Sequence, residues 1–378
     1  MAGPLGGLKV VQLASLAPAP FGCMVLADLG AEVIRVERAG GGDALSVPSG
    51  YFDRGQRSIA VDLRSPEGVQ VVLDLIRDAD VLVEGFRPGV TERLGIGPED
   101  CWKVNRGLVY GRLTGFGQDG PLASAAGHDI NYIAVSGALE PIGRAGERPY
   151  APLNIVADFA GGGFLLAIGV LAALRERDVS GEGQVVDAAM VDGSALLTTF
   201  FHGMASAGLW TDQRGTNFFD GGAAFYDTYE CSDGGFMAVG AVEPQFYALL
   251  LDKLGLTGAA LPHPFDTDRA DELRAVFADV FRTRTRAEWT EVFDGVDACV
   301  TPVLSPWEAH EHPHNAARGT FVDVAGKRQP APAPRFSRTP APTPGAAPRP
   351  GADTDTLLAG LGYDAAAVAD LRDRDVIG

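Results

Sequence analysis

The segment LKVVQLASLAPAPFGCMVLADLGAEVIRVE, residues 8–37, decides the fold class. Its short apolar run Lys9–Leu13 predicts a buried strand, and Glu32–Glu37 predicts a second one. Between them, Gly22–Leu29 has the apolar pattern of a helix, which Gly30 ends. A strand, a helix and a strand in this order are typical of a βαβ unit with parallel strands. The segment therefore predicts an α/β fold.

The alternation of helices and strands continues along the first half of the chain. A helix is predicted from about Pro66 to Ala79, and strands are predicted at Val81–Glu84 and Leu108–Leu113. Long apolar helices are predicted from Asp158 onward and over Asp187–Met204. This pattern indicates a Rossmann-like domain built on a parallel sheet.

The second half of the chain has a different pattern. Residues from about Phe225 to Val303 predict two strands joined by a turn and then short helices, which indicates a smaller α+β domain. The Gly-rich residues 217–224 predict a loop before it. The Pro-rich tract Arg328–Gly351 predicts an extended or polyproline II path over the surface.

Charge composition limits the possible partners. The 378 residues include 49 acidic and 31 basic side chains, which gives a net charge of -18. A chain this acidic is not expected to bind nucleic acid or an anionic membrane surface. Arginines that cluster locally must therefore hold any anionic ligand.

Cysteine usage and the first residues indicate a compartment. No C-x-x-C pair occurs, so neither a disulfide framework nor a thiolate metal site is expected from Cys23, Cys101, Cys231 and Cys299. The opening MAGPLGGLKVVQL lacks the basic start and apolar run of a signal peptide. Because no uninterrupted apolar segment of about 18 residues occurs either, we expect a soluble, cytoplasmic protein with no membrane association.

Two motifs of the chain resemble cofactor or metal sites but lack the required spacing. The turn ASLAPAPFG after the first strand lacks the G-x-G-x-x-G that lets backbone approach a pyrophosphate, which disfavours a nicotinamide or flavin dinucleotide. The histidines His310, His312 and His314 alternate in HEHPH, and this spacing with Pro313 matches no helical pair of metal ligands. Exposed loop histidines are expected there, and no metal site is predicted.

Three acid-base residues have local settings that favour function. His128 in AAGHDINYIAVSG lies at a bend before a helix that starts at Asp129, although a capping or partly buried structural histidine explains it as well. Asp158 in NIVADFAGGGF precedes three glycines, so a helix start there can bind an anion; a plain N-cap is the alternative. Glu243 in VGAVEPQFY follows a predicted strand, and Pro244 forces an extended turn, although a surface glutamate is equally simple.

These settings carry a family resemblance. GHDINYIAVSG, PLNIVADFAGGG, GEGQVVDAAMVDG, GGAAFYDTYECSDG and VGAVEPQFY resemble the α-methylacyl-CoA racemases, within the wider class III CoA-transferase (CaiB/BaiF) family. The resemblance extends from LGGLKVVQL near the start to APAPRFSRT, almost the whole chain. It implies an interlocked homodimer in which both ends of the chain build the large Rossmann-like domain and two linkers join a small domain.

The resemblance also implies domain boundaries. We expect the large domain over residues 1–195, a linker over 196–224, the small domain over 225–305, a second linker over 306–327 and a return to the large domain over 328–378.

Roles for the site residues follow from the resemblance position by position. His128 and Asp158 match the two catalytic bases, and Glu243, from the partner subunit, matches the glutamate that orients the histidine. Asp129 matches the residue whose backbone N–H holds the thioester oxygen. Contacts to CoA are expected from Arg38, Leu63, Gly85, Arg87 and Arg93. Arginine suits phosphate because its guanidinium offers a fork of donors.

The implied reaction is racemisation of 2-methylacyl-CoA thioesters at the α-carbon, by 1,1-proton transfer through an enolate. No cofactor is implied, because CoA is part of the substrate; the expected partners are an acyl-CoA thioester and a second copy of the chain. The alternative is a class III CoA-transferase, in which Asp158 is the nucleophile that accepts the acyl group. Transferases of the family generally lack the histidine of GHDINY and the glutamate of VGAVEPQFY, which favours the racemase.

Overall fold

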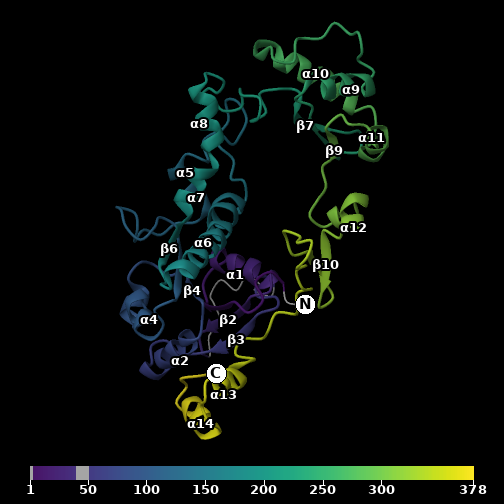
Figure 1. Cartoon of the computed structure of the whole chain (residues 1–378). Coiled ribbons are helices and arrows are strands. Elements are labelled where there is room, and N and C mark those ends of the chain that lie inside the picture. The colour runs from purple at the N-terminus through teal and green to yellow at the C-terminus, as the bar shows by residue number, and fades with distance from the viewer. Residues whose placement is uncertain (1–2, 40–50) are drawn as a thin grey trace. The chain divides into compact units, whose positions relative to one another are not determined.

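The computed structural model describes residues 3–39 and 51–378, which divide into two compact units (Figure 1). Unit 1 comprises the described part of Met1–Ser136 together with Pro152–Leu197 and Gly319–Gly378. Unit 2 comprises Gly137–Ala151 and Thr198–Arg318. The purple beginning and the yellow end of the described chain therefore belong to the same unit.

Two boundaries differ from the expected ones. Residues 137–151, expected in the large domain, belong to unit 2, where Arg214 donates hydrogen bonds to the carbonyl oxygens of Glu140 and Glu147, each at 3.0 Å. Residues 319–327, expected in a linker, belong to unit 1 because they form most of a hairpin there.

Unit 1 is built on a parallel sheet, as the sequence predicted, and this sheet has six strands. The strand order is β3-β2-β1-β4-β5-β6. The strands are β1 Lys9–Leu13, β2 Glu32–Glu37, β3 Arg57–Ala60, β4 Val81–Glu84, β5 Val109–Thr114 and β6 Val185–Ala189. The chain builds outward from β1 to β3 and then returns to β4 at the other side of β1. This reversal places a switch point between β1 and β4, where ligands of such sheets bind.

Helices cover both faces of this sheet. Tyr110 packs into a core shared with α2 Pro66–Arg77, α4 Pro98–Val104, α13 Thr354–Gly360 and α14 Ala365–Asp373. The next residue, Gly111, lies against Leu166 and Val170 of α6 Leu165–Ser180. Since adjacent residues of a strand point to opposite faces, the two helical layers lie on opposite sides. The remaining helices of unit 1 are α1 Pro18–Asp28, α3 Val90–Leu94, α5 Asp129–Ser136, the π-helix η2 Ile155–Phe164 and α7 Met190–Leu197.

Several predicted elements have different bounds in the structure. Helix α1 begins at Pro18 rather than Gly22, since a proline at the first helical position lacks the N–H that would stay unbonded there. The prediction of one helix over Asp187–Met204 is wrong: Val185–Ala189 is strand β6, paired in parallel with β5, and α7 follows. Strand β3 was not predicted.

The C-terminal segment completes unit 1. Strands β10 Phe321–Val324 and β11 Lys327–Pro330 form an antiparallel hairpin. Beyond the Pro-rich tract, Ile377 pairs with Val61 next to β3. Arg54 links the hairpin to the sheet domain, because its guanidinium bonds to Asp28 Oδ1 (3.0 Å) and to Gln329 Oε1 (3.1 Å).

Unit 2 contains an antiparallel sheet of β7 Tyr226–Glu230, β8 Phe236–Gly240 and β9 Val300–Pro302. Its core is aromatic: the rings of Tyr229 and Phe281 stack at 5.1 Å, and Trp289 packs edge-on against Phe281. The helices are α8 Thr199–Ser206, α9 Pro244–Lys253, η3 Thr267–Arg269, α10 Ala270–Phe281, α11 Arg286–Phe293, η4 Ala309–Glu311 and α12 Pro313–Arg318.

The helix Ile155–Ser180, formed by η2 and α6 together, is long and apolar enough to cross a membrane by length and composition, with a mean hydropathy of 2.0. In the structure it packs against α1 and α7 and against strands β5 and β6. Leu166, Ala167 and Val170 are buried in this core, whereas Phe164 and Ile168 of the same helix are exposed. The expected absence of membrane association stays a prediction.

Candidate active site

The positions expected to contact CoA follow the carboxyl ends of the sheet strands. Arg38 comes directly after β2, Leu63 comes shortly after β3, and Gly85 and Arg87 come directly after β4. Arg38, Arg87 and Arg93 of α3 are exposed. Three arginines and one glycine therefore lie on the segments that leave one edge of the sheet, and this is the edge where a parallel sheet binds its ligand.

At the switch point the backbone leaves no room for a side chain. A Cβ added to Gly85 would lie 2.8 Å from Ser15 Oγ, just beyond the end of β1. Within the described residues, this buried Ser15 hydroxyl has no hydrogen-bond partner. Ser15 was not predicted as a site residue, although its position shortly after the predicted strand Lys9–Leu13 was a signal that could have identified it.

A buried ion-pair network holds the loop that carries Gly85 and Arg87. Glu84, 1% exposed, accepts hydrogen bonds from the backbone N–H of Phe86 (2.6 Å) and from Arg112 Nε (2.9 Å). Arg112 also donates to Glu92 of α3 (2.7 Å). Burial raises the pKa of Glu84, and the hydrogen bond from Arg112 opposes this. The network connects β4, β5 and α3 and so fixes both ends of the loop.

His128 is exposed at the residue before α5. Its carbonyl oxygen accepts from the backbone N–H of Asn131 (2.8 Å), and its own N–H donates to Asn131 Oδ1 (3.1 Å), so backbone bonds fix the bend. The Tyr132 ring packs over Gly127: a Cβ there would lie 2.7 Å from a ring carbon. A small residue is therefore required directly before His128.

Asp158 is half-buried in η2, and its backbone N–H donates to Asp129, the residue after His128. Its Oδ2 accepts from Asn154 Nδ2 at 3.0 Å. Burial and the nearby Asp129 carboxylate raise the pKa of Asp158, whereas the Asn154 hydrogen bond and His128 lower it. The N-cap interpretation is wrong, since Asn154 occupies the N-cap position of η2 and Asp158 lies inside the helix.

The three glycines after Asp158 serve helix packing. A Cβ on Gly161 would lie 2.8 Å from the backbone nitrogen of Ser194 in α7. A Cβ on Gly163 would lie 2.8 Å from the carbonyl oxygen of Pro18 in α1. The glycines therefore let η2 contact both helices at backbone distance, which fixes the segment that carries Asp158.

Asp129, the first residue of α5, has a buried side chain. The sequence predicted a role for its backbone N–H and none for this side chain. Its Oδ2 accepts the backbone N–H groups of Ala157 (2.7 Å) and Asp158 (2.8 Å). One carboxylate oxygen thus joins the segment of His128 to the segment of Asp158.

Glu243 belongs to unit 2, whereas His128 and Asp158 belong to unit 1. It lies at the N-cap position of α9 with extended backbone angles and with Pro244 as the first helical residue. Its side chain is exposed and makes no capping hydrogen bond.

Two other arginines of unit 1 are paired with side chains of the same unit. Arg54 is buried against Asp28, and Arg57 donates to Glu32 (3.0 Å) and to Thr356 (3.1 Å). Both guanidinium groups therefore serve the structure of unit 1.

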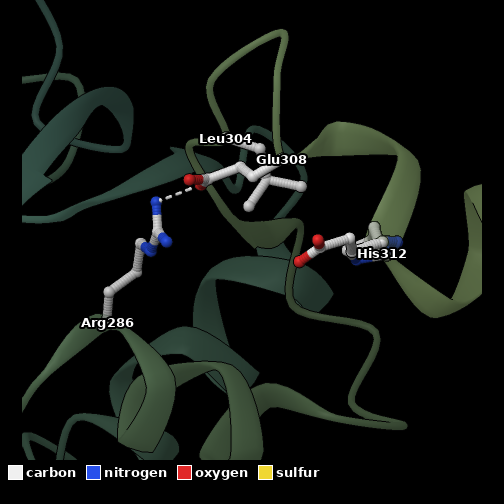
Figure 2. A pocket seen from close by; sticks show the side chains of 5 residues that line it. Arg286, Leu304, Glu308 and His312 are labelled. Carbon is white, nitrogen blue, oxygen red and sulfur yellow. Dashed lines mark ion pairs between the residues drawn. The ribbon is translucent and has the colours of Figure 1, made fainter. Parts of the chain in front are cut away.

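The HEHPH tract lies in unit 2 next to a small pocket of about 200 Å³, lined by Arg286, Leu304, Glu308, Glu311 and His312 (Figure 2). Arg286 forms an ion pair with Glu308 at 2.7 Å across this pocket. Throughout residues 3–39 and 51–378, no three His, Cys, Asp or Glu side chains group in a way that could hold a metal ion.

Comparison with known proteins places this geometry in a family. The chain is 52% identical to the α-methylacyl-CoA racemase of Mus musculus and 51% identical to that of Homo sapiens, over 89% of this chain and 87% of each relative. A CaiB/BaiF family protein from Brucella suis has a similar structure, with a TM-score of 0.83 and 27% identity, over 96% of this chain and 100% of that one. The family model of CoA-transferase family III matches residues 5–354. The chain belongs to CoA-transferase family III.

Proposed function

We propose that this chain is an α-methylacyl-CoA racemase, an isomerase that interconverts the two epimers of a 2-methylacyl-CoA thioester. The observation that carries the proposal is the hydrogen bond from the backbone N–H of Asp158 to Asp129, the residue after His128, in a chain about half identical to proteins named for this activity. Inversion at the α-carbon requires removal of a proton from one face and delivery of a proton to the other. An imidazole and a carboxyl group can supply both transfers.

The enolate formed between these transfers needs stabilisation. The backbone N–H of Asp129 starts α5, so the positive end of the helix dipole lies there. Donors directed at a developing oxyanion contribute about 3 to 4 kcal/mol to the transition state. The raised pKa of Asp158 makes its carboxylate a stronger base than a free aspartate. The difference in pKa between this base and the weakly acidic α-proton is therefore smaller.

Arg38, Arg87 and Arg93 would hold the phosphates of CoA, with Leu63 and Gly85 near the adenine and pantetheine. Their positions after β2, β3 and β4 and in α3 support this assignment. No metal or redox cofactor is required, because the carboxyl group, the imidazole and the helix start cover each step. The cytoplasm is the proposed compartment.

The active form would be an interlocked homodimer, in which the partner subunit's Glu243 orients His128. Unit 1 exposes apolar side chains on α5, η2, α6 and α7, which supports burial against a second copy. They are Val135, Ile155, Phe164, Ile168 and Leu197, with Ile168 63% exposed. A carboxylate beside an imidazole fixes its tautomer and stabilises its protonated form.

The alternative within the family is CoA transfer with Asp158 as the nucleophile. The half-buried carboxylate of Asp158 supports it, since this group could accept an acyl unit as an anhydride. Hydroxylamine would trap such an intermediate and leave a mass change on the Asp158 peptide. Trapping, together with transfer of CoA to a free carboxylic acid, would replace the racemase proposal.

The direct test is proton exchange. One epimer of a 2-methylacyl-CoA, incubated with the protein in heavy water, should gain deuterium at C2 and approach an equal mixture of epimers. A chelator should leave the rate unchanged. Retention of the α-proton across a broad panel of 2-methylacyl thioesters would contradict the proposal.

A further inference from the structure

The side chain of Asp129 joins the segments that carry the two proposed bases. It is 4% exposed and belongs to α5, directly after His128. Its Oδ2 receives the N–H groups of Ala157 and Asp158, 28 and 29 residues later in the chain. Within the described residues, its second oxygen, Oδ1, is buried without a hydrogen-bond partner.

These bonds have a structural reason. The first N–H groups of a helix have no partner inside the helix, and those of Ala157 and Asp158 lie in the first turn of η2. A carboxylate satisfies them better than a neutral acceptor because the bonds are charge-assisted and the helix start favours an anion. Here the acceptor comes from the neighbouring catalytic segment rather than from the residue before the helix.

We propose that the Asp129 carboxylate is a positioning residue with two separable effects: its oxygen fixes Asp158 relative to His128, and its negative charge strengthens Asp158 as a base. The proposal rests on the proposed racemase function and extends it from the backbone of Asp129 to its side chain. Each effect has its own physical basis in the site.

The positional effect follows from the reaction. Two bases must address opposite faces of one carbon, and a displacement of about 1 Å can lower a rate about a hundredfold. A direct bond between the two segments limits this displacement.

The electrostatic effect follows from the groups around Asp158. Asn154 of its own segment donates a hydrogen bond, His128 is a nearby basic group, and Asp129 is the nearby carboxylate. Tyr132 of α5 is a further neighbour: burial and then the Asp158 carboxylate raise the pKa of Tyr132. Of these groups, Asp129 is the anion that disfavours ionisation of Asp158 through its charge.

Because one oxygen accepts both hydrogen bonds, two substitutions separate the effects. Asp129→Asn keeps an oxygen for both N–H groups and removes the charge. Asp129→Ala removes both. Asp192→Asn, at an exposed position of α7, is the control for the loss of one negative charge elsewhere in unit 1.

The first measurement is ionisation of Asp158 as a function of pH, read by carbodiimide coupling and peptide mass spectrometry. Cleavage after Arg144 and Arg175 gives the peptide 145–175, in which Glu147 is the second carboxyl group. Glu147 is exposed and serves as an internal reference. The half-coupling pH of Asp158 should fall in Asp129→Asn and stay at the wild-type value in Asp192→Asn. An unchanged or higher value in Asp129→Asn would overturn the electrostatic effect.

The second measurement is deuterium exchange at C2. Asp129→Asn should lose less than about tenfold and Asp129→Ala about a hundredfold. Full activity in a folded Asp129→Ala protein would overturn the positional effect. Absence of exchange in the wild type would instead refute the racemase function, and the coupling experiment would still decide the charge effect because it requires no turnover.

Discussion

The proposed dimer predicts that two inactive variants complement each other. His128→Ala removes one base, and Glu243→Ala removes the carboxylate that would orient this base. Loss of such a general acid-base group lowers a rate by about a hundredfold to ten-thousandfold, so each variant alone should be nearly inactive. His128 lies in unit 1 and Glu243 in unit 2, so a cross-subunit site can combine the intact unit of each variant.

The size of the recovery follows from symmetry. Random reassociation of equal amounts gives about half mixed dimers, and each mixed dimer contains one intact site and one doubly defective site. Mixtures unfolded and refolded together should therefore recover about a quarter of the wild-type racemisation rate per chain. Racemisation is followed by the loss of optical rotation of one epimer.

The control mixes the two folded variants without unfolding, which should leave the rate at the level of the single variants. Heterodimers are isolated through two different affinity tags. Isolated heterodimers that remain inactive would show that His128 and Glu243 act from the same chain.

Three further predictions concern the ionisation of Asp158 and the stability of the fold. Asp158 must be ionised to accept a proton, and its pKa is raised, so kcat/KM should decline with falling pH at a pH above the ordinary aspartate range. A decline of kcat/KM centred near pH 4 would contradict this. Glu84→Ala leaves the buried Arg112 with one carboxylate fewer and should lower the free energy of unfolding by about 3 kcal/mol in urea titrations, with a smaller loss for Glu84→Gln. Gly163→Ala places a Cβ 2.8 Å from a carbonyl oxygen of α1 and should cost about 1 to 3 kcal/mol, whereas Gly203→Ala, with open space around it, should gain about 0.5 to 1 kcal/mol.

The parallel sheet could be predicted because its strands are short apolar runs bounded by turns. Lys9–Leu13, Glu32–Glu37 and Val81–Glu84 are strands over the predicted bounds. Residues 187–189 of β6 were assigned to a helix because the apolar run 188–191 continues from the strand into α7, and periodicity cannot separate a strand from a buried helix in such a short run. These residues form a strand because they pair with β5, which lies more than 70 residues earlier in the chain.

The candidate site could be predicted in part. His128 and Asp158 were identified from their motifs, and in the structure Asp129, the residue after His128, accepts the backbone N–H of Asp158. Their catalytic roles stay a prediction. The bonds from Ala157 and Asp158 to Asp129 depend on a close approach between segments 28 residues apart, and no local pattern encodes it. Ser15 is similar, since its proximity to Gly85 exists only once β1 and β4 are adjacent.

The contribution of the last residues to unit 1 has a consequence for biosynthesis. The core beneath β2 and β3 includes Leu358, Leu371 and Ile377, and Ile377 pairs with Val61. During translation at about 5 to 20 residues per second, roughly 15 to 60 s separate the synthesis of β3 from that of its covering helices. Throughout this interval the nascent sheet exposes apolar surface and one unpaired strand edge. Unit 1 therefore cannot complete its core until these residues have been synthesised, and we expect the chain to depend on chaperones that shield the amino-terminal half until then.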